Sequence, residues 1–361
     1  MTQVMDEIAL EERSGAFAER IFGAAVGAGD LFLMDIGVRL GLYEALHEGG
    51  PATSTELAER SGCSERYVRE WLEHQAVSGI LELGANEARY SLPEAHALCL
   101  IDADNLAYLG ALAKSVTVFG KAVEWVADAF RTGDGIPYER YGLDGVEVQG
   151  DFTRAMFKNL LTQEWLPTLT EVHERLLSDP AARFADIACG IGFAAIEIAK
   201  AYPKVAVDGF DLDETSIAIA RRNAAEAGVT DRVRFEVKDG SDPELAGAYD
   251  VITIFEAVHD MSNPVGVLQG ARRLLAGDGI LIVADERTGE SVTEPGPLDS
   301  FFYTASVLYC LPQSMAEQPS AAIGTVIRSS TMQTLADQAG FSTAEVLPIE
   351  NDFWRFYGLT T

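Results

Sequence analysis

A glycine-rich turn with an acidic residue downstream is the part of this sequence best suited to chemistry. Residues 184–195 read Phe-Ala-Asp-Ile-Ala-Cys-Gly-Ile-Gly-Phe-Ala-Ala: an apolar run, a turn containing Gly190 and Gly192, and the start of a helix. Glycine lets the backbone approach a ligand where a Cβ would collide, and the following helix offers free N–H groups. Asp211 ends the next apolar run, where a carboxylate can accept hydrogen bonds from a ribose. The pattern therefore predicts a site for a cofactor that contains a nucleoside.

Alternating strands and helices would hold this turn in place. Beyond Arg183, short apolar runs that are typical of strands alternate with segments of helical spacing. Strands are expected at 184–188, 205–210, 233–237, 250–255 and 279–285, and helices at about 192–201, 214–227 and 264–276. A helix at 331–339 and two strands at 343–348 and 352–357 end the chain. The alternation predicts an α/β fold with a doubly wound, parallel sheet that an antiparallel hairpin closes.

The first 95 residues have the pattern of a winged helix-turn-helix. Thr53-Ser-Thr-Glu56 is a capping box that opens a short helix, and Ser64 can cap a second helix. A small hairpin is expected within 81–92, and a loop rich in Gly and Asp at 132–150 interrupts the helical segment that follows. We therefore expect a winged-helix dimerisation domain at 1–95, a helical connector or substrate cap at 96–178, and a cofactor-binding domain at 179–361.

The charge of the chain disfavours nucleic acid as a partner. Its 361 residues include 56 acidic and 27 basic side chains, a net charge of −29. The first 95 residues contain seven arginines, no lysine and 17 acidic residues. Along the would-be recognition helix, Arg66 and Arg69 are offset by glutamates. Because contacts to phosphate supply most of the non-specific affinity for DNA, we expect no nucleic-acid partner.

Cysteine usage and hydropathy indicate a cytoplasmic protein. The four cysteines, at positions 63, 99, 189 and 310, are far apart and form no Cys-x-x-Cys pair, which indicates reduced thiols. The sequence has no uninterrupted apolar span of membrane length, and its acidic start is unlike a signal peptide. We therefore expect no membrane partner.

The residues resemble a class I S-adenosylmethionine-dependent methyltransferase with an N-terminal winged-helix domain. The resemblance is closest to bacterial small-molecule methyltransferases and more distant to plant-type O-methyltransferases. The matching blocks are 186–192, 209–213, 238–240, 255–261 and 275–279. The resemblance implies a Rossmann-like sheet, S-adenosylmethionine as cofactor, S-adenosylhomocysteine as product, and a homodimer formed through the N-terminal domain.

The resemblance also assigns cofactor contacts to matching positions. Asp186 would orient the glycine loop or reach the methionine amino group, while Gly190 and Gly192 would approach the methionine portion. Asp211 would hold the ribose hydroxyls. The adenine would lie against Leu212 and donate to Asp239, with Gly240 and Phe255 as further cofactor contacts. Ala188 stands where the family usually has its first glycine, and alanine excludes the freest backbone conformations.

His259 is the candidate general base. It follows the fourth strand by a few residues, at the crevice where open α/β sheets bind ligands, and histidine suits proton transfer near neutral pH. In plant-type O-methyltransferases a His-Asp-Trp sequence at this place supplies the base, and His259-Asp260-Met261 resembles it. The resemblance assigns the orientation of His259 to Asp285, at the end of the fifth strand, or to its rival Glu286. His259 could instead cap the following helix or pack without a catalytic role.

A metal site is the other option at this place. Some methyltransferases of this type that act on 2-oxo acids bind a metal through the same His-Asp pair and a later histidine. No histidine follows His259 here, so a metal would need carboxylate ligands, and we expect none.

The acceptor pocket is expected to draw on the aromatic segment 301–310 and on the middle helices. Tyr303 and Ser306 are the best candidates by position, with Trp165 among the helical residues. Aromatic rings suit a flat or apolar acceptor, but the same residues also fit a core at helical spacing.

The sequence therefore predicts methyl transfer from S-adenosylmethionine to a small molecule, at a hydroxyl oxygen if His259 is the base. The alternatives are N- or C-methyl transfer to a small metabolite and a winged-helix regulator that senses a cofactor. A nicotinamide oxidoreductase shares the glycine turn, but Asp186 within the first strand and the terminal hairpin both disfavour it.

Overall fold

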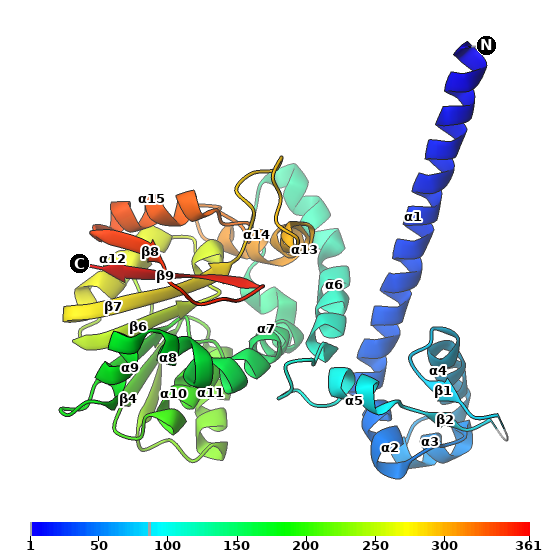
Figure 1. Ribbon diagram of the computed structural model, residues 1–361, viewed down its shortest axis with the longest axis horizontal. Coiled ribbons are helices and arrows are strands. Elements are labelled where there is room, and N and C mark those ends of the chain that lie inside the picture. Colours follow the sequence, from blue (N-terminus) through cyan, green and yellow to red (C-terminus); the bar gives the residue numbers. More distant parts are fainter. Residues whose placement is uncertain (1, 86–87) are drawn as a thin grey trace. The chain divides into compact units, whose positions relative to one another are not determined.

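The computed structural model describes residues 2–85 and 88–361, with side chains from residue 10 onward, and forms two compact units (Figure 1). The units are Met1–Thr117 and Val118–Thr361, whereas the sequence predicts three parts divided at 95 and 178. The helices beyond Thr117 belong to the second unit because buried side chains from Val118 to Val148 pack with Tyr309 and Cys310. The role of 96–178 as a substrate cap stays a prediction.

The first unit is helical and has a two-stranded wing. Its elements are α1 (Thr2–Arg39), α2 (Leu42–Gly49), α3 (Ser54–Ser61), α4 (Glu65–Val77), β1 (Glu82–Leu83), β2 (Tyr90–Ser91) and α5 (Glu94–Leu100). The capping box is confirmed: Thr53 Oγ1 accepts from Glu56 N at 3.3 Å, and Glu56 Oε2 accepts from Thr53 N at 2.9 Å. Ser64 is the N-cap residue of α4, as predicted, but its side chain makes no capping hydrogen bond. β1 and β2 pair antiparallel as predicted, and turn residues 86–87 lie outside the described residues.

α1 carries an exposed apolar face. Its exposed large apolar side chains are Leu10, Phe17, Ile21, Phe22, Val26, Phe32 and Ile36. By length and composition alone, Leu10–Arg39 could cross a membrane, which is weak evidence because soluble helices pass the same test. Its last turns are tied to the winged helix: Asp30 accepts from Ser78 Oγ at 2.7 Å, and Trp71 Nε1 donates to the Leu33 carbonyl at 2.8 Å. A helix whose acidic side chain is bonded to a folded domain is poorly suited to span a bilayer.

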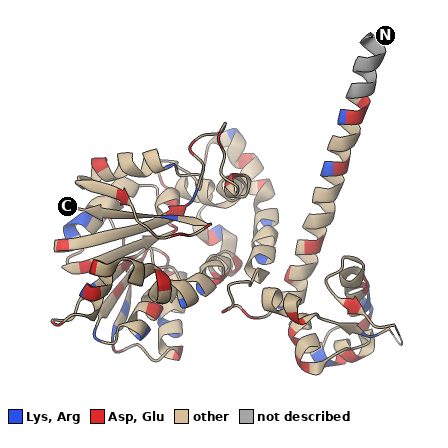
Figure 2. Cartoon of the chain, viewed as in Figure 1, with Lys and Arg blue, Asp and Glu red and all other residues tan. Residues whose placement is uncertain are grey.

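Acidic side chains outnumber basic ones along the chain (Figure 2). In α4, Arg66 pairs with Glu70, and Arg69 Nη2 lies 2.7 Å from Glu65 Oε2. These ion pairs within one helix leave little cationic charge for phosphates. The absence of a nucleic-acid partner nevertheless stays a prediction.

A seven-stranded sheet organises the second unit, in the order β5-β4-β3-β6-β7-β9-β8. The strands are β3 (Arg183–Ile187), β4 (Ala206–Asp211), β5 (Val233–Val237), β6 (Tyr249–Phe255), β7 (Leu275–Glu286), β8 (Thr343–Val346) and β9 (Trp354–Thr360). β3 to β7 are parallel, and β9 pairs antiparallel with β7 and β8. The predicted Rossmann-like sheet with a closing hairpin is confirmed. Because the chain order reverses at β3, between β4 and β6, the carboxyl ends of these strands form the expected ligand crevice.

Helices cover both faces of this sheet (Figure 1). One face packs against α10 (Phe193–Ala201) and α11 (Glu214–Glu226), and the other against α12 (Pro264–Leu274) and α15 (Ser329–Ala339). Within β3, Phe184 belongs to the first core and its neighbour Ala185 to the second. A strand buried on both faces reads as a continuous apolar run, which is why these strands could be predicted.

The middle of the chain is more helical than predicted. Its elements are α6 (Gly110–Thr132), the 3-10 helix η1 (Tyr138–Tyr141), α7 (Gly142–Met156), the π-helix η2 (Phe157–Trp165), α8 (Leu166–Thr168) and α9 (Thr170–Leu177). The loop predicted at 132–150 is wrong in its second half, where Val146 and Val148 of α7 are buried. This tertiary packing outweighs the poor helix propensity of the glycines in α7. Beyond β7 lie α13 (Asp299–Ala305), the π-helix η4 (Ser306–Cys310) and α14 (Leu311–Ser314).

The contact between α12 and the loop after β5 gives a test of this fold. A Cβ added at Gly270 would lie 1.9 Å from the carbonyl oxygen of Gly240. We expect Gly270→Ala to lower the free energy of unfolding in urea by about 1–3 kcal/mol, because the added methyl group forces the backbones apart. Gly277→Ala is the matched control, since a Cβ there meets nothing within 4 Å. Equal unfolding midpoints for the two variants would contradict this packing.

Candidate active site

The glycine turn is a left-handed backbone segment anchored by Asp211. Ala188, Gly190 and Gly192 have φ of 56°, 52° and 84°. A Cβ at Gly192 would lie 2.5 Å from Cζ of Phe235, so only glycine fits there. Asp211 Oδ2 accepts from Gly190 N at 2.8 Å, and its Oδ1 accepts from Asp213 N at 2.9 Å. The acid that the sequence assigns to a ribose thus also holds the turn in shape.

Ala188 adopts a left-handed backbone conformation, which glycine would adopt without strain. Left-handed backbone is costly for an L-residue with a Cβ. The departure from the family pattern therefore leaves the path of the turn intact, with alanine taking the left-handed φ.

Asp186 lies at the base of the turn. It is 2% exposed, and Thr253 Oγ1 donates to its Oδ1 at 2.7 Å. Burial raises its pKa to about 7, although the Thr253 hydrogen bond lowers it. Burial also raises the pKa of Asp211, against the backbone N–H groups that stabilise its charge. Asp186 lines a pocket, and Asp211 is linked to the same pocket through its hydrogen bond with Gly190.

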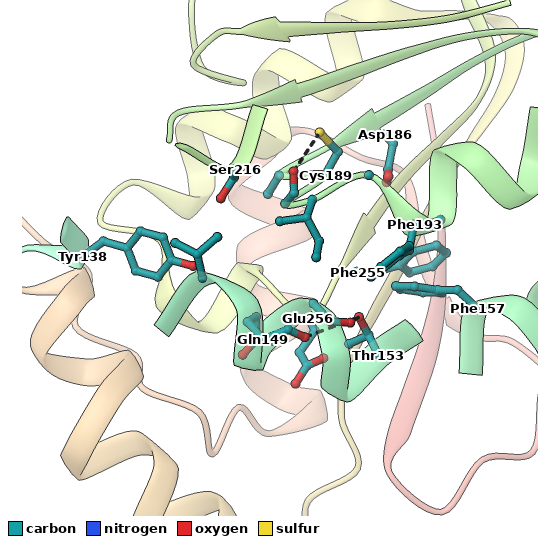
Figure 3. A pocket seen from close by; sticks show the side chains of 17 residues that line it. Tyr138, Gln149, Thr153, Phe157, Asp186, Cys189, Phe193, Ser216, Phe255 and Glu256 are labelled. Carbon is teal, nitrogen blue, oxygen red and sulfur yellow. Dashed lines mark hydrogen bonds between the residues drawn. The ribbon is translucent and has the colours of Figure 1, made fainter. Parts of the chain in front are cut away.

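The pocket beside the turn has walls that the sequence does not predict (Figure 3). The glycine turn, Asp186 and Phe255 form one side, as expected. Tyr138 of η1, Gln149 and Thr153 of α7, and Phe157 of η2 form another. The lining residues also include Ser216 of α11 and Glu256 after β6. α7 packs closely against the turn, because a Cβ at Gly150 would lie 2.1 Å from Cδ1 of Ile191, but no local sequence motif indicates this contact.

Four predicted cofactor contacts, Asp211, Leu212, Asp239 and Gly240, are not among these lining residues, although Asp211 bonds to Gly190, which is. Leu212 is 62% exposed, and Asp239 is exposed with its Oδ1 accepting from Ser241 N at 2.7 Å. Gly240 is buried, where a Cβ would meet Ile187 and Val267. An adenine role for Leu212 and Asp239 stays a prediction, whereas the contacts of Gly240 are those of a packing residue. Phe255, by contrast, lines the pocket and lies parallel to Trp354, with ring centroids 6.3 Å apart.

His259 is held by two neighbouring carboxyls. It lies in the 3-10 helix η3 (Val258–Asp260) and is 2% exposed. Its Nδ1 lies 2.6 Å from Asp285 Oδ1 and 3.0 Å from Glu286 Oε2, so both rivals named from the sequence are adjacent to it. The hydrogen bond goes to Asp285, while Glu286 Oε2 and Asp285 Oδ2 are buried without a hydrogen-bond partner among the described residues.

This arrangement favours a charged His259. Burial lowers the pKa of His259, but attraction by Glu286 and Asp285 outweighs burial and raises that pKa well above the ordinary value. Burial acts to raise the pKa of Asp285, yet His259 holds it below its ordinary value. Burial and the neighbouring Asp285 charge raise the pKa of Glu286. The directions of these pKa shifts favour charge on His259 and Asp285 and retention of the proton on Glu286.

The same three side chains have the spacing of a possible metal site. Ligand atoms of His259, Asp285 and Glu286 lie within 4.8 Å of one another, as the carboxylate alternative requires. The Nδ1–Asp285 hydrogen bond already accounts for this spacing. The expectation of no metal stays a prediction.

The predicted acceptor-lining residues have mixed surroundings. Trp165 is 3% exposed and packs on Trp354 and Phe356 in the core, with centroids 5.6 and 5.0 Å away, so its environment is that of a core residue. Ser306 is buried in η4 and accepts from Thr325 N at 3.2 Å. Tyr303 is 41% exposed, and its hydroxyl accepts from Arg328 Nη2 at 3.2 Å. Roles for Ser306 and Tyr303 stay predictions.

Comparison with known proteins supports the methyltransferase interpretation. Residues 178–340 match a family described as "Methyltransferase domain", and residues 28–101 match an "Rv2258c-like winged HTH domain". The chain is 36% identical over 104 residues to 27-O-demethylrifamycin SV methyltransferase of Amycolatopsis mediterranei, covering 28% of this chain and 38% of that protein. It is 28% identical over 145 residues to a ubiquinone biosynthesis O-methyltransferase of Marinobacter nauticus, covering 36% and 60%. The chain thus matches only part of the length of these curated relatives.

Solved structures share the fold over nearly the whole chain. The mitomycin 7-O-methyltransferase superposes with a TM-score of 0.68 at 20% identity, covering 96% of this chain and 98% of that one. Human N-acetylserotonin methyltransferase in complex with SAM gives 0.67 at 17% identity, covering 95% and 97%. Residues 178–340 thus match a methyltransferase domain and residues 28–101 a winged-helix domain, on a fold that solved methyltransferase structures share.

Proposed function

We propose that this protein transfers a methyl group from S-adenosylmethionine to a hydroxyl oxygen of a small molecule. The hydrogen bond between His259 Nδ1 and Asp285 Oδ1, at 2.6 Å, carries the proposal because it prepares a buried base. S-Adenosylmethionine supplies the methyl group on a positively charged sulfur. The names of the relatives, which act on oxygen, support the choice of acceptor atom.

The residues around the glycine turn fit this cofactor. Gly192 leaves room where a side chain would collide with Phe235, and Asp186 and Ser216 line the same pocket. Asp211 already accepts two backbone hydrogen bonds, but carboxylate oxygens have further lone pairs for ribose hydroxyls. These residues would bind and orient the cofactor.

His259 would take the proton of the acceptor hydroxyl. Above its raised pKa His259 is neutral, and the Asp285 hydrogen bond then keeps the remaining proton on Nδ1 and leaves Nε2 free to accept a proton. Asp285 then stabilises the imidazolium that forms. Much of the remaining rate enhancement would come from alignment of the acceptor and exclusion of water, which the buried position of His259 favours.

N- or C-methyl transfer is the alternative within the same class. An uncharged amine is nucleophilic without loss of a proton, so such a reaction would depend less on His259. A DNA-binding regulator is disfavoured because the arginines of α4 pair with glutamates of their own helix.

The protein is also proposed to be cytoplasmic. Its four cysteines are free, and Cys310 is buried. Free thiols are typical of proteins that remain in a reducing compartment.

Calorimetric titration tests the cofactor. We expect S-adenosylmethionine and S-adenosylhomocysteine to bind with micromolar affinity and NAD not to bind. Asp211→Ala should weaken binding of both adenosyl compounds more than tenfold, because it removes the ribose acceptor and frees the Gly190 N–H. Asp208→Ala, on the same strand, is the control. Unchanged affinity in Asp211→Ala would remove this residue from the site, and failure of wild type to bind either compound would refute the cofactor.

Substitution of His259 tests the base. Once a screen of phenolic and other small acceptors gives turnover, His259→Ala should retain cofactor affinity but lose at least about 100-fold in kcat, as expected for loss of a general base. Because its pKa is raised, wild-type kcat/KM should increase with pH over a range above the ordinary histidine value of 6.5. His173→Ala is the control, since His173 lies on α9 and its Nδ1 is hydrogen-bonded to the Tyr202 hydroxyl. A fully active His259→Ala would exclude the base assignment and favour an amine acceptor.

The exposed face of α1 is proposed to form a homodimer. Light scattering should show a dimer for wild type and a monomer for Phe22→Asp, because Phe22 is 73% exposed among neighbouring apolar residues of this helix. Val77→Asp is the control, as an exposed apolar residue on α4. A monomeric wild type, or a dimeric Phe22→Asp, would contradict the proposal.

A further inference from the structure

Glu256 has a strained backbone in the wall of the cofactor pocket. It follows β6 directly and has φ of 52°, in the left-handed region that glycine favours. Its N–H donates to the Ala284 carbonyl at 2.7 Å, which ties this conformation to β7. Strained backbone of this kind persists only where surrounding structure enforces it, and it occurs often at ligand sites. The conformation places the Glu256 side chain among the pocket residues (Figure 3).

The carboxyl of Glu256 lacks a cationic partner in this pocket. Its Oε2 is buried and makes no hydrogen bond among the described residues. None of the residues that line the pocket is a lysine or an arginine. Burial raises the pKa of Glu256 to about 8; His259 and a hydrogen bond from Gln149 lower it, while Asp285 and Asp260 raise it. A buried carboxyl so placed would be stabilised by a positive charge in the pocket.

The chemistry of methyl transfer puts such a charge near Glu256. The acceptor oxygen must lie within hydrogen-bond reach of His259, and the sulfur and oxygen are in line with the methyl group between them. The sulfur must therefore lie toward the side of the cofactor pocket that is nearest His259. Glu256 lines that pocket and precedes His259 by only a few residues.

We propose that the Glu256 carboxylate is the counter-ion of the cofactor's sulfonium. This inference rests on the proposed function and adds a residue to it. Because the sulfur of the product is uncharged, Glu256 attracts the methyl donor but gains nothing from the spent cofactor. The residue thereby makes the site prefer S-adenosylmethionine to S-adenosylhomocysteine and limits inhibition by the product.

Binding of the two adenosyl compounds to Glu256→Gln tests the assignment. Calorimetry is done at about pH 8.5, where a carboxyl with a pKa of about 8 is mostly ionised. Glutamine keeps the size of the side chain and removes the charge. We expect affinity for S-adenosylmethionine to fall at least about tenfold, from the loss of a close ion pair in a pocket of low dielectric constant. Affinity for S-adenosylhomocysteine should stay within about twofold, since its sulfur is neutral. Retained binding of this product also shows that the variant is folded.

A matched charge removal and a third ligand complete the design. Glu345→Gln removes one acidic charge from an exposed position on β8, an edge strand of the sheet. It should change the affinity for neither adenosyl compound. Equal losses for both compounds would overturn the inference, because the carboxylate would then act on a group that both share. 5′-Methylthioadenosine lacks the amino-acid portion of both compounds. If Glu256→Gln bound it as tightly as wild type does, the shared group would be the ammonium. Unchanged affinity for S-adenosylmethionine would also overturn it. If wild type binds neither compound, the proposed function itself fails.

Discussion

Burial of ionisable side chains at the carboxyl ends of parallel strands is the constraint on which this site depends. Desolvation of a carboxyl is costly unless hydrogen bonds or an opposite charge compensate it. Asp211 is compensated by the backbone N–H groups of Gly190 in the glycine turn and of Asp213, and Asp186 by the hydroxyl of Thr253. Asp285 is compensated by His259, whose pKa the surrounding carboxyls raise. Gly190, Thr253 and His259, which compensate these carboxyls, each lie on or shortly after a strand that is adjacent in the sheet.

The sheet topology explains why these groups meet. β3 lies between β4 and β6, so the residues that end these strands share one edge although they are far apart in the chain. β7 follows β6 in the sheet and carries Asp285 to His259. The contact between His259 and Asp285 therefore depends on the pairing of β6 with β7, and the turn geometry depends on the pairing of β3 with β4.

Much of the sheet and part of the site follow from sequence. Strands buried on both faces are largely apolar. Asp211 could be located because it ends such a strand, and His259 because it follows one by a few residues. The wall formed by α7 could not be predicted, because its glycines indicate a loop and only packing against the sheet domain makes the segment helical. Gln149 and Thr153 belong to no local motif, so their place in the pocket follows from long-range contacts. Glu256 lies inside a recognised block, but its left-handed backbone is invisible in the sequence.

The two π-helices affect how this chain can be aligned with its relatives. η2 spans Phe157–Trp165 and η4 spans Ser306–Cys310, and each replaces i→i+4 bonds by i→i+5 bonds. One extra residue in a turn rotates every later side chain by about 100° relative to an uninterrupted α-helix. Trp165, at the end of η2, lies in the core although its position suggested a place in the pocket. An alignment of this chain with a protein whose corresponding helices are α-helical throughout would therefore need a single-residue gap there to keep pocket-facing positions apart from core positions.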